Sequence, residues 1–457
     1  MTTRRTLSLR SLPFRRAHAA PGGDGHHAAA RLSRSTVTML LITYAVVTVL
    51  GSLYLLTVRD RPGLDMEVYW RAAQVLHGVN PNTQDLYAPS LVTAGDLELP
   101  FTYPPLSALI FYPLGGLTLE QAWTVMAITG VALTGLYVLV ILRLAPFSRP
   151  WFGANPVVSV LAFLGLFGVI WNLYPVYFTL VFGQVNILLV LLILWDLARP
   201  QSKVWGRGVL TGFTAGFKVT PAAMGLVPLA QGRWRTIVGM AAGLATTVVL
   251  SALFLPREVW DYFTSQLWQT SRVGEDARIS NLSLNGSLQM LNLPDGWADP
   301  LRIILVLAVI VGGALGIRRV SRAGDVFSAT MIGALVMLLI SPISWEHHWV
   351  WVGPLMVALI PTNPRTASAW QWGVAVIVVG LLLWTFTSAP SVFAAELLGP
   401  DFPNRVVLTG PPVLERVATL PVWAGLAAGI WLAVRPYPSS PAPVPVPTND
   451  DAAQLAR

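Results

Sequence analysis

The apolar stretch TVTMLLITYAVVTVLGSLYLLTV, residues 36–58, decides the fold class of this chain. A bilayer core about 30 Å thick needs roughly 20 apolar residues per helix, so this run is long enough to cross a membrane. Several further apolar runs follow it. Hydrophobic residues make up 54% of the 457 residues and charged residues only 11%, against about 25% charged residues in soluble domains. The sequence therefore predicts an all-α, polytopic integral membrane protein.

Residues 1–35 form a basic arm directly before this first span. The arm carries seven arginines and one acid. A cleavable signal would have a shorter apolar core followed by small residues, so we expect the arm to be retained, and the positive-inside rule places it in the cytoplasm. It supplies most of the net charge of +8 as a topology determinant, and we expect no nucleic-acid binding. The Pro-rich residues 435–457 predict a disordered cytoplasmic tail.

Arginine clusters after the first span indicate the sidedness of the later apolar runs. The predicted outer loops are residues 59–103, 256–300 and 389–418. Two segments resist assignment: residues 102–114 are short and Pro-rich, and residues 208–230 are interrupted by Lys218 and Pro221. Each could be a short span, a broken helix or a re-entrant piece. The chain has about 10 spans if neither segment crosses and about 12 if both do.

The motif GLDMEVYWR, residues 63–71, places two carboxylates just beyond the first span. A carboxylate at the water–lipid boundary is suited to removing a proton from a substrate hydroxyl. Asp65 and Glu67 diverge by about 200° on a helix, so they cannot both face one cavity. We expect one of them to be functional and the other to be structural or solvated. The alternative is that both are water-exposed boundary residues.

The segment SPISWEHHWVWV, residues 341–352, and a lysine within an apolar run carry further candidate groups. Glu346, His347 and His348 lie among tryptophans, and histidine can act as a base, bind phosphate or bind metal. The alternative is an aromatic belt with histidines at headgroup level. Lys218 is one of two lysines and interrupts an apolar run, where a charge is costly. It could neutralise a phosphate, pair with a carboxylate or snorkel to the boundary.

Some chemistries are excluded by what the sequence lacks. The chain has no cysteine, so it has no disulfide, thiol nucleophile or Cys-based metal site. Adjacent histidines project in different directions and no further ligand is evident, so we predict no metal site and no cofactor. The amides of GQVN, residues 183–186, and NLSLNGSLQ, residues 281–289, suit sugar hydroxyls but equally suit contacts between helices. No P-loop or GxGxxG motif occurs, and a lipid-linked donor would need neither.

Six motifs in a fixed order resemble those of a known family. They are LDMEVYWRAAQVLHG, FTYPPLSALIFYPL, GQVNILLVLL, GFKVTPAAMGLVPLAQGRWR, NLSLNGSL and SPISWEHHWVW. This set is similar to the actinobacterial polyprenol-phosphate-sugar-dependent glycosyltransferases of the GT-C fold. Within that group it most resembles the α-1,2-mannosyltransferases of glycosyltransferase family 87, which build phosphatidylinositol mannosides and lipomannan. The resemblance covers residues 36–434.

This resemblance implies a GT-C bundle of about 10–12 transmembrane helices whose outer loops form the active site. It implies inverting, metal-independent transfer from polyprenyl-phosphate-mannose to a mannosylated glycolipid at the outer face of the plasma membrane. Asp65 occupies the position of the catalytic base in the motif Gly-x-Asp-x-x-x-Tyr. The other residues for which we expect substrate contacts are Glu67, Tyr69, Trp70, Arg71, Tyr103, Asn186, Lys218, Asn281 and Glu346.

The resemblance further implies that His347 or His348 contacts the donor phosphate or assists proton handling. Adjacent helical positions diverge by about 100°, so we expect only one of the two to point squarely into the cavity. A neighbouring phosphate or carboxylate would favour the imidazolium form of that ring.

Two other functions remain open from the sequence. Relatives of the resembled family use an arabinofuranosyl donor for the same chemistry. A lipid-sugar flippase or transporter would call for internal repeats and polar pairs in the middle of the membrane. No clear repeat is present, and the polar candidates concentrate on one predicted face, which favours an enzyme.

Overall fold

The computed structural model describes eight segments of the chain. They are residues 32–58, 62–94, 97–199, 206–274, 280–291, 293–294, 296–387 and 417–437. Most of the predicted basic arm, nearly all of the third outer loop and most of the C-terminal tail lie outside the described residues. The domain boundaries expected from the sequence therefore stay predictions.

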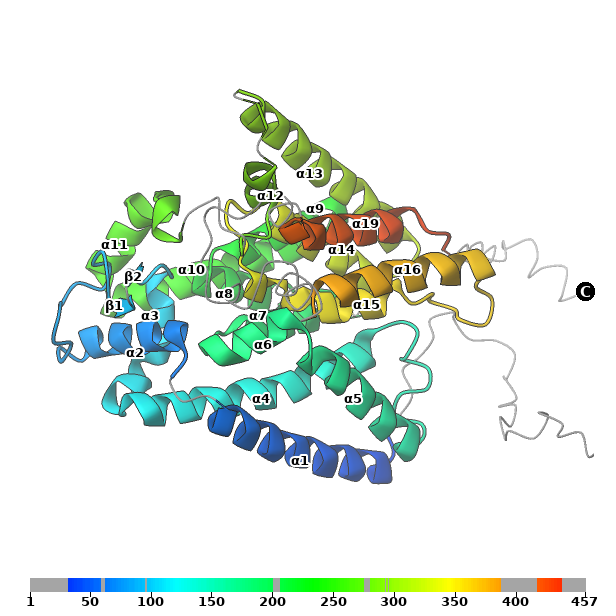
Figure 1. Ribbon diagram of the computed structural model, residues 1–457, viewed down its shortest axis with the longest axis horizontal. Helices are drawn as coiled ribbons and strands as arrows, with labels where there is room; N and C mark the ends of the chain where they lie inside the picture. Colours follow the sequence, from blue (N-terminus) through cyan, green and yellow to red (C-terminus); the bar gives the residue numbers. More distant parts are fainter. Residues whose placement is uncertain are drawn as a thin grey trace, which may run out of the picture. The chain divides into compact units, whose positions relative to one another are not determined.

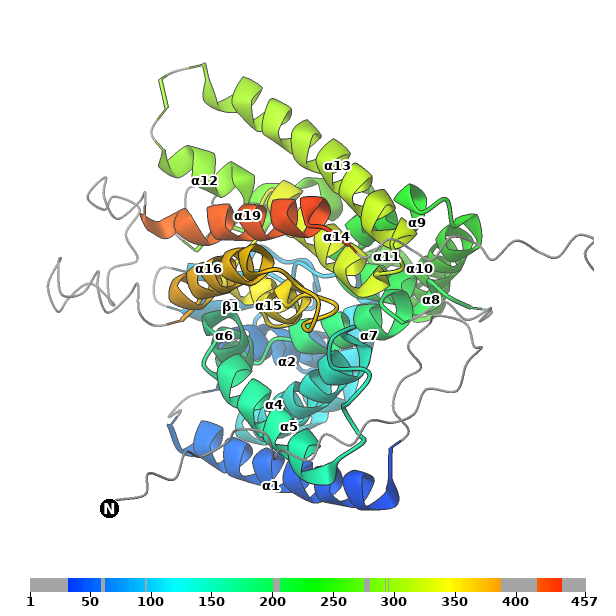
Figure 2. The same ribbon diagram turned by 90° about the vertical axis from the view of Figure 1, so that its right-hand side faces the viewer.

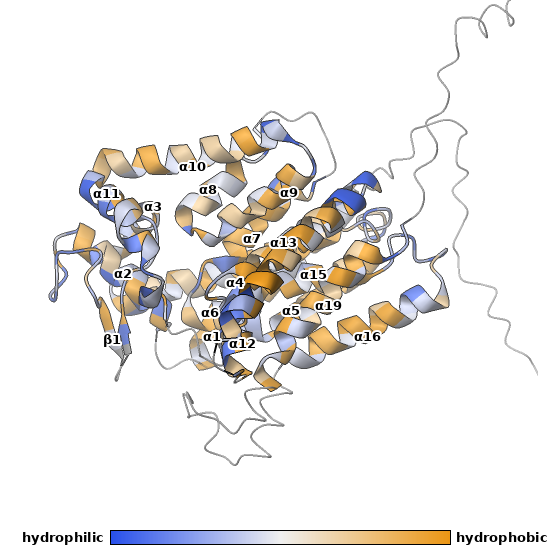
Figure 3. Cartoon of the chain, turned by 90° about the horizontal axis from the view of Figure 1, so that it is seen from above, coloured by the Kyte–Doolittle hydropathy of each residue, from blue (hydrophilic) through white to orange (hydrophobic). Residues whose placement is uncertain are grey.

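Four described helices are long and apolar enough to cross a membrane. They are α1 (Arg34–Val58), α4 (Leu119–Leu144), α10 (Trp234–Phe254) and α13 (Ala298–Arg322). A fifth span would be the bent pair of α5 (Pro156–Trp171) and α6 (Tyr174–Phe182), whose axes differ by 75°. Along α10, α13 and the shorter helix α16 (Ala369–Thr385) hydrophobic residues predominate (Figure 3). These helices confirm a multi-pass, all-α membrane protein, whereas the span count and the sidedness of the loops stay predictions.

Large apolar side chains on the outer faces of these helices show why they suit a bilayer. On α13, Ile304, Leu307 and Leu315 are each more than half exposed. A helix with so apolar an outer face is unfavourable in water and is typical of a membrane span. Its inner face packs against α14 (Val326–Ile340) and α19 (Leu420–Val434), and the three helices lie side by side (Figures 1 and 2).

Of the two segments that the sequence left open, residues 102–114 contain one short helix and residues 208–230 form a broken helix. α3 (Pro105–Phe111) continues into the 3-10 turn η1 (Tyr112–Gly116). α8 (Val209–Phe217) stops at Lys218, whose backbone is extended (φ −143°, ψ 129°). The chain then resumes as η2 (Thr220–Gly225) and α9 (Leu226–Ala230). Pro221, which lacks a backbone N–H, cannot extend a continuous helix through this point.

The predicted outer loops contain short elements. The first holds α2 (Leu64–Leu76) and an antiparallel hairpin of β1 (Val92–Ala94) and β2 (Leu97–Leu99), with Val92 opposite Leu99. This hairpin is the one sheet among the described residues and the one local departure from the all-α prediction. The second loop holds α11 (Pro256–Thr264), η3 (Gln266–Trp268), η4 (Thr270–Arg272) and α12 (Leu284–Met290).

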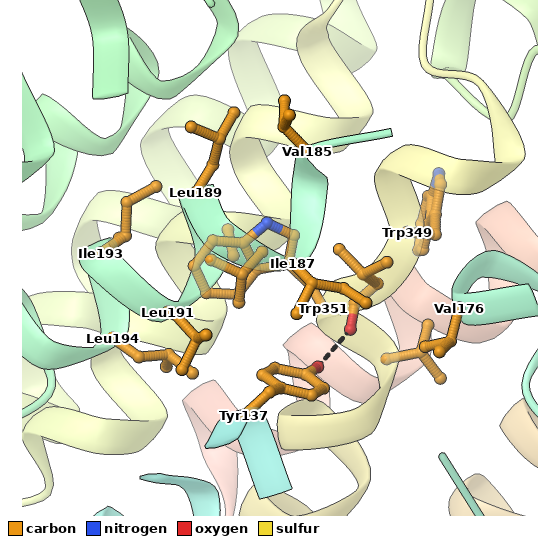
Figure 4. Packing of buried hydrophobic residues seen from close by; sticks show 14 of the residues in the cluster. Tyr137, Val176, Val185, Ile187, Leu189, Leu191, Ile193, Leu194, Trp349 and Trp351 are labelled. Atoms are coloured by element: carbon orange, nitrogen blue, oxygen red, sulfur yellow. Dashed lines mark hydrogen bonds between the residues drawn. The ribbon is translucent and has the colours of Figure 1, made fainter. Parts of the chain in front are cut away.

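The histidine segment sits on the buried core of the bundle. It forms η5 (Glu346–Trp351) and leads into α15 (Val352–Leu359). Trp349 is fully buried and donates a hydrogen bond to the carbonyl of Leu282 at 3.0 Å. Tyr137 of α4 donates to the carbonyl of Val350 within a cluster of aliphatic side chains from α7 (Asn186–Leu197) (Figure 4). This packing fixes the backbone that carries Glu346 and the two histidines.

An ion pair closes the opposite end of the bundle. The Arg435 guanidinium lies 3.1 Å from the Asp325 carboxylate, and both side chains are buried. Arg435 also donates to the carbonyl of Ala358 at 2.7 Å, near the end of α15. Asp325 caps the N-terminus of α14 by accepting from the Ser328 amide at 2.9 Å. One guanidinium therefore joins the ends of α14, α15 and α19.

The contact between α8 and α10 determines where Lys218 lies. The Asp196 carboxylate caps α8 by accepting from the amides of Gly208 and Thr211 at 2.8 and 2.9 Å. A Cβ atom at Gly212 would lie 1.9 Å from the carbonyl oxygen of Met240, so the two backbones touch, as they do at small-residue interfaces in membranes. Because α8 ends at Lys218, this contact fixes the position of the lysine.

Replacing Gly212 by alanine should therefore destabilise the protein. The neighbouring atom belongs to the backbone and cannot rotate away, so we expect overpacking to cost about 1–3 kcal/mol. Gly168 is a matched control, because a Cβ atom there would meet nothing within 4 Å. Thermal unfolding in detergent should show a lower Tm for Gly212→Ala than for Gly168→Ala. Equal Tm values would contradict the close contact.

Candidate active site

A cavity of about 680 Å³ collects polar side chains from segments far apart in the sequence. Its walls come from α2, from the strand and loop residues 98–104, from the second outer loop and from the 341–348 segment. The polar and titratable side chains that line it include Asp65, Tyr69, Tyr103, Gln184, Lys218, Glu346, His347 and His348. The structure thus brings the carboxylate motif, Lys218 and the histidine pair to one place.

Asp65 lies in the first turn of α2, at the cavity wall. A Cβ atom at Gly63 would lie 2.5 Å from the backbone of Phe182, so only glycine allows α2 to begin this close to the end of α6. This approach places Asp65 in hydrogen-bond contact with Gln184. Burial raises the pKa of the Asp65 carboxyl, while the Gln184 hydrogen bond and the charge of Lys218 act in the opposite direction. Asp65 is thus a stronger base than an exposed aspartate.

Gln184 organises the carboxylate side of the cavity. Its Oε1 accepts hydrogen bonds from the hydroxyls of Tyr69 at 2.8 Å and Tyr103 at 3.1 Å. The amide N–H groups are therefore left to donate to Asp65. The two hydroxyls also lie 2.8 Å apart. Three elements are locked together around the carboxylate in this way.

Glu67, Trp70 and Arg71 were expected to contact substrate, and the structure places them outside this cavity. Glu67 lies 3.6 Å from Arg71, and the Arg71 guanidinium stacks 4.7 Å over the Trp70 ring. The Trp70 indole donates to the carbonyl of Leu117 at 3.0 Å. Helix geometry explains the difference, because residues four apart share a face: Asp65 and Tyr69 face the cavity while these three residues face away. The predicted divergence of Asp65 from Glu67 is confirmed.

Lys218 lies at the centre of a second cluster of polar groups. Its Nζ is 2.9 Å from His348 Nε2, 3.1 Å from Asn186 Oδ1 and 3.4 Å from the Tyr103 hydroxyl. An ammonium group only donates, so Nε2 of His348 accepts and the ring proton is on Nδ1. In this arrangement Lys218 is a cation that faces the cavity, and His348 positions it.

The two histidines both line the cavity, and they differ in their contacts. Their rings are perpendicular at a centroid distance of 4.8 Å. The His347 carbonyl accepts from Asn186 Nδ2 at 2.9 Å and Thr179 Oγ1 at 3.2 Å, whereas its ring Nδ1 has no partner among the described residues. Burial and the charge of Lys218 hold the pKa of both rings well below the ordinary value. Burial and the charge of Lys218 therefore favour neutral rings, and the imidazolium expected beside a donor phosphate stays a prediction.

Glu346 is a second carboxyl group on the cavity wall. Burial raises the pKa of Glu346 to about 7, and the nearby charge of Asp65 also acts to raise it. Its Oε2 has no hydrogen-bond partner within the described part of the chain. Glu346 is therefore partly protonated at neutral pH and remains available to a ligand.

Two asparagines that were expected to line the cavity have other roles. Asn281 is buried and does not line the cavity. Its Nδ2 donates a hydrogen bond to the Pro342 carbonyl at 3.2 Å, and its Oδ1 accepts one from the backbone N–H of Ser344 at 2.9 Å. It holds the segment that leads to Glu346. Asn186 lies behind Lys218 and borders a separate small void. Both amides support the site from outside the cavity, which spacing along the sequence could not reveal.

Sequence reasoning missed several polar residues of the cavity wall, among them Gln184 and Arg272. Gln184 stands two positions before Asn186 in the GQVN motif, so the motif was recognised but the wrong amide was chosen. Arg272 lines the cavity and donates to the carbonyls of Tyr87 and Ala88 at 3.0 and 3.3 Å. No local pattern distinguishes Arg272 from other loop arginines.

A multi-pass bundle that places a carboxylate and a cation on the wall of one cavity is typical of a membrane-embedded enzyme. A family model, Glycosyltransferase family 87, matches residues 101–342. The chain belongs to this family and is a glycosyltransferase, which sets aside the flippase and transporter alternative.

Several relatives are similar to this chain over most of its length. A polyprenol-phosphate-mannose-dependent alpha-(1-2)-phosphatidylinositol mannoside mannosyltransferase of Mycobacterium tuberculosis is 30% identical over 70% of this chain and 76% of its own. The corresponding phosphatidylinositol pentamannoside mannosyltransferase of Mycolicibacterium smegmatis is 32% identical over 76% and 81%. An alpha-(1->3)-arabinofuranosyltransferase of Mycobacterium tuberculosis is 24% identical over 59% and 61%. No solved structure shows a significant match.

Replacing His348 by phenylalanine should slow glycosyl transfer without unfolding the protein. The variant keeps an aromatic ring but removes the acceptor of Lys218, and misplacing a reacting group by about 1 Å can cost about 100-fold. His348→Gln, which restores an acceptor, should recover most of the rate. His77→Phe is the control, since His77 contacts Tyr112 away from the cavity. Initial rates of glycosyl transfer would be measured for the three variants and the wild type. Equal rates for His348→Phe and wild type would contradict a positioning role for His348.

Proposed function

We propose that this protein transfers mannose from polyprenyl-phosphate-mannose to a phosphatidylinositol mannoside or lipomannan acceptor, forming an α-1,2 linkage. The transfer takes place at the outer face of the plasma membrane, with both termini in the cytoplasm, in a bundle of the GT-C type. The observation that carries the proposal is the placement of Asp65 and Lys218 on one cavity, each with a side-chain hydrogen bond. Two relatives that are named for this donor, for a phosphatidylinositol mannoside acceptor and for an alpha-(1-2) linkage support it.

The geometry supports an inverting displacement. The acceptor hydroxyl attacks the anomeric carbon while the bond from that carbon to the phosphate oxygen breaks. Asp65 takes the hydroxyl proton, and its raised pKa makes that transfer more favourable. Lys218 stabilises the charge that remains on the departing lipid phosphate. The base and the cation thus act on the two ends of one reaction.

No metal ion enters this mechanism. Within the described residues no group of three or more His, Asp or Glu side chains is arranged to hold one. Lys218 supplies one positive charge for the phosphate, which is the role that a divalent cation often has in phosphate chemistry. Metal independence stays a prediction.

An arabinofuranosyl donor is the second candidate. It is favoured by the similarity to an alpha-(1->3)-arabinofuranosyltransferase, which covers a smaller share of this chain at lower identity than the mannosyltransferases do. Both donors would place a lipid phosphate beside Lys218, so the same residues would act on either.

The donor is identified by a direct assay. Purified protein would be incubated with polyprenyl-phosphate-mannose or polyprenyl-phosphate-arabinose and with phosphatidylinositol mannosides, and products would be identified by mass. We expect addition of one hexose from the first donor, unchanged by EDTA. A pentose product would favour the second candidate. Loss of activity in EDTA that Mg²⁺ or Mn²⁺ restores would contradict metal independence.

Replacing Asp65 by asparagine should abolish transfer while preserving the fold. The side chain keeps its size but loses the base, which typically contributes about 10²–10⁴-fold. Glu67→Gln is the matched control, because Glu67 lies two residues away on the same helix and outside the cavity. Single-turnover rates and Tm would be measured for both variants. If Asp65→Asn kept more than about a tenth of the wild-type rate, Asp65 would not be the base.

The pH dependence of transfer should reveal the raised pKa of Asp65. The base acts in its ionised form, so kcat/KM should fall as the pH drops through that pKa. Because burial raises the pKa, the fall should begin at a higher pH than the ordinary aspartate value of about 3.9 would give. The profile would be compared with those of Glu67→Gln and Glu346→Gln. Loss of the acidic limb in Glu346→Gln would instead assign it to Glu346.

A further inference from the structure

The chain that leaves α10 exposes its largest apolar side chains. Leu253 and Phe254, at the end of α10, are each 70% exposed, and Trp260 and Trp268 are each 74% exposed. Scattered exposed apolar residues are normal, but this series of large ones continues past the end of α10, which indicates contact with lipid or with another protein surface. Tryptophan is enriched where a membrane meets water, because its ring is apolar and its indole N–H is polar.

The segment has two distinct faces. On α11, Arg257, Trp260 and Thr264 are exposed at spacings of three and four residues, which places them on one side of the helix. Tyr262 on the other side is buried and packs against Tyr87 at a ring-centroid distance of 5.7 Å. In Figure 3, α11 follows directly on the hydrophobic α10 and carries polar residues beside apolar ones. The exposed face of α11 thus carries a tryptophan beside an arginine, which are residue types that anchor a membrane protein at the level of the lipid headgroups.

We propose that residues 253–268, here called the interfacial anchor, lie in the plane of the lipid headgroups with Trp260 and Trp268 inserted among the lipids. The occupant of the exposed face is the bilayer that α10 crosses. Continuity supports this choice, since α10 ends at Phe254 and α11 begins at Pro256 with a single residue between them. A helix that leaves a span without a connecting loop starts at the depth at which the span ends.

The interfacial anchor is also continuous with the wall of the cavity. Gln266, Leu267 and residues 269–274 line the cavity directly after Trp260 and around Trp268. At the end of this wall, a Cβ atom on Gly274 would lie 2.5 Å from the Trp345 ring. The backbone of the wall therefore packs closely against Trp345, which directly precedes Glu346. The anchor therefore holds one wall of the active site at the lipid surface, beside which a lipid-linked substrate would pass.

Spin labels test the placement of the anchor independently of any activity. The chain has no native cysteine, so nitroxide labels at Trp260→Cys and Trp268→Cys would be unique. Asn82→Cys is the control, an exposed residue in the first outer loop. In phosphatidylcholine liposomes we expect the labels at 260 and 268 to collide more with oxygen than with a water-soluble nickel chelate, and the label at 82 to show the reverse.

Other outcomes of this experiment would overturn the proposal. Labels at 260 and 268 that behave like the label at 82 would place the anchor in water. Labels shielded from both reagents would indicate that another protein surface covers them. Thr264→Cys, on the same exposed face, provides a further site should either tryptophan variant fail to fold.

A kinetic test, which rests on the proposed function, measures whether the interfacial anchor helps a lipid-linked donor to enter the active site. The pair Trp260→Ser with Trp268→Ser should raise KM for a long-chain polyprenyl donor in liposomes by roughly tenfold, with kcat unchanged. The pair Trp260→Phe with Trp268→Phe should retain the wild-type KM. A short-chain, water-soluble donor should show no difference between the pairs. Equal KM values for the long-chain donor would overturn the role in entry, whereas absence of any transfer would concern the proposed function alone.

Discussion

The hydrogen-bonded position of Lys218 is the constraint on which the site depends. A lone ammonium in an apolar bundle is unfavourable unless polar groups surround it. Here the helix breaks at the lysine, and His348 and Asn186 approach its Nζ within 3.1 Å. The Asp196 cap and the contact between α8 and α10 hold that break in place. The break in the helix at Lys218 thus allows polar groups to surround the ammonium within the bundle.

Tyr103 links the cation to the carboxylate. Its hydroxyl lies 3.4 Å from Lys218 Nζ, and it donates to Gln184, which bonds Asp65. The basic and the acidic sides of the cavity therefore share one hydrogen-bonded network. Because every member of such a network restricts its neighbours, the network sets the distance between the Asp65 carboxylate and the Lys218 ammonium before a substrate binds. Preorganisation of this kind is what charge stabilisation in a transition state requires.

The sequence predicted elements well and contacts between elements poorly. Hydropathy identified the membrane class and the first span, and helix periodicity separated Asp65 from Glu67. The same periodicity could have assigned Trp70 and Arg71 to the face of α2 that points away from the cavity, but their residue types suggested contact with substrate instead. Asn281 and Gln184 could not be told apart from the sequence, because each amide is assigned by a partner on another element. The protonation of the histidines depends in the same way on burial by other elements and on Lys218, which lies 130 residues from His348 in the chain.

The buried Arg435 has a consequence for biogenesis. Asp325 and the carbonyls at the end of α15 lie earlier in the chain than the guanidinium that satisfies them. During synthesis a buried carboxylate at α14 stays without its counter-ion until residue 435 has left the ribosome, and an unpaired buried charge is strongly destabilising. Final closure of the helix bundle is therefore a late event. A nascent chain interrupted before that arginine therefore leaves the Asp325 carboxylate and the carbonyls at the end of α15 without the guanidinium that joins them.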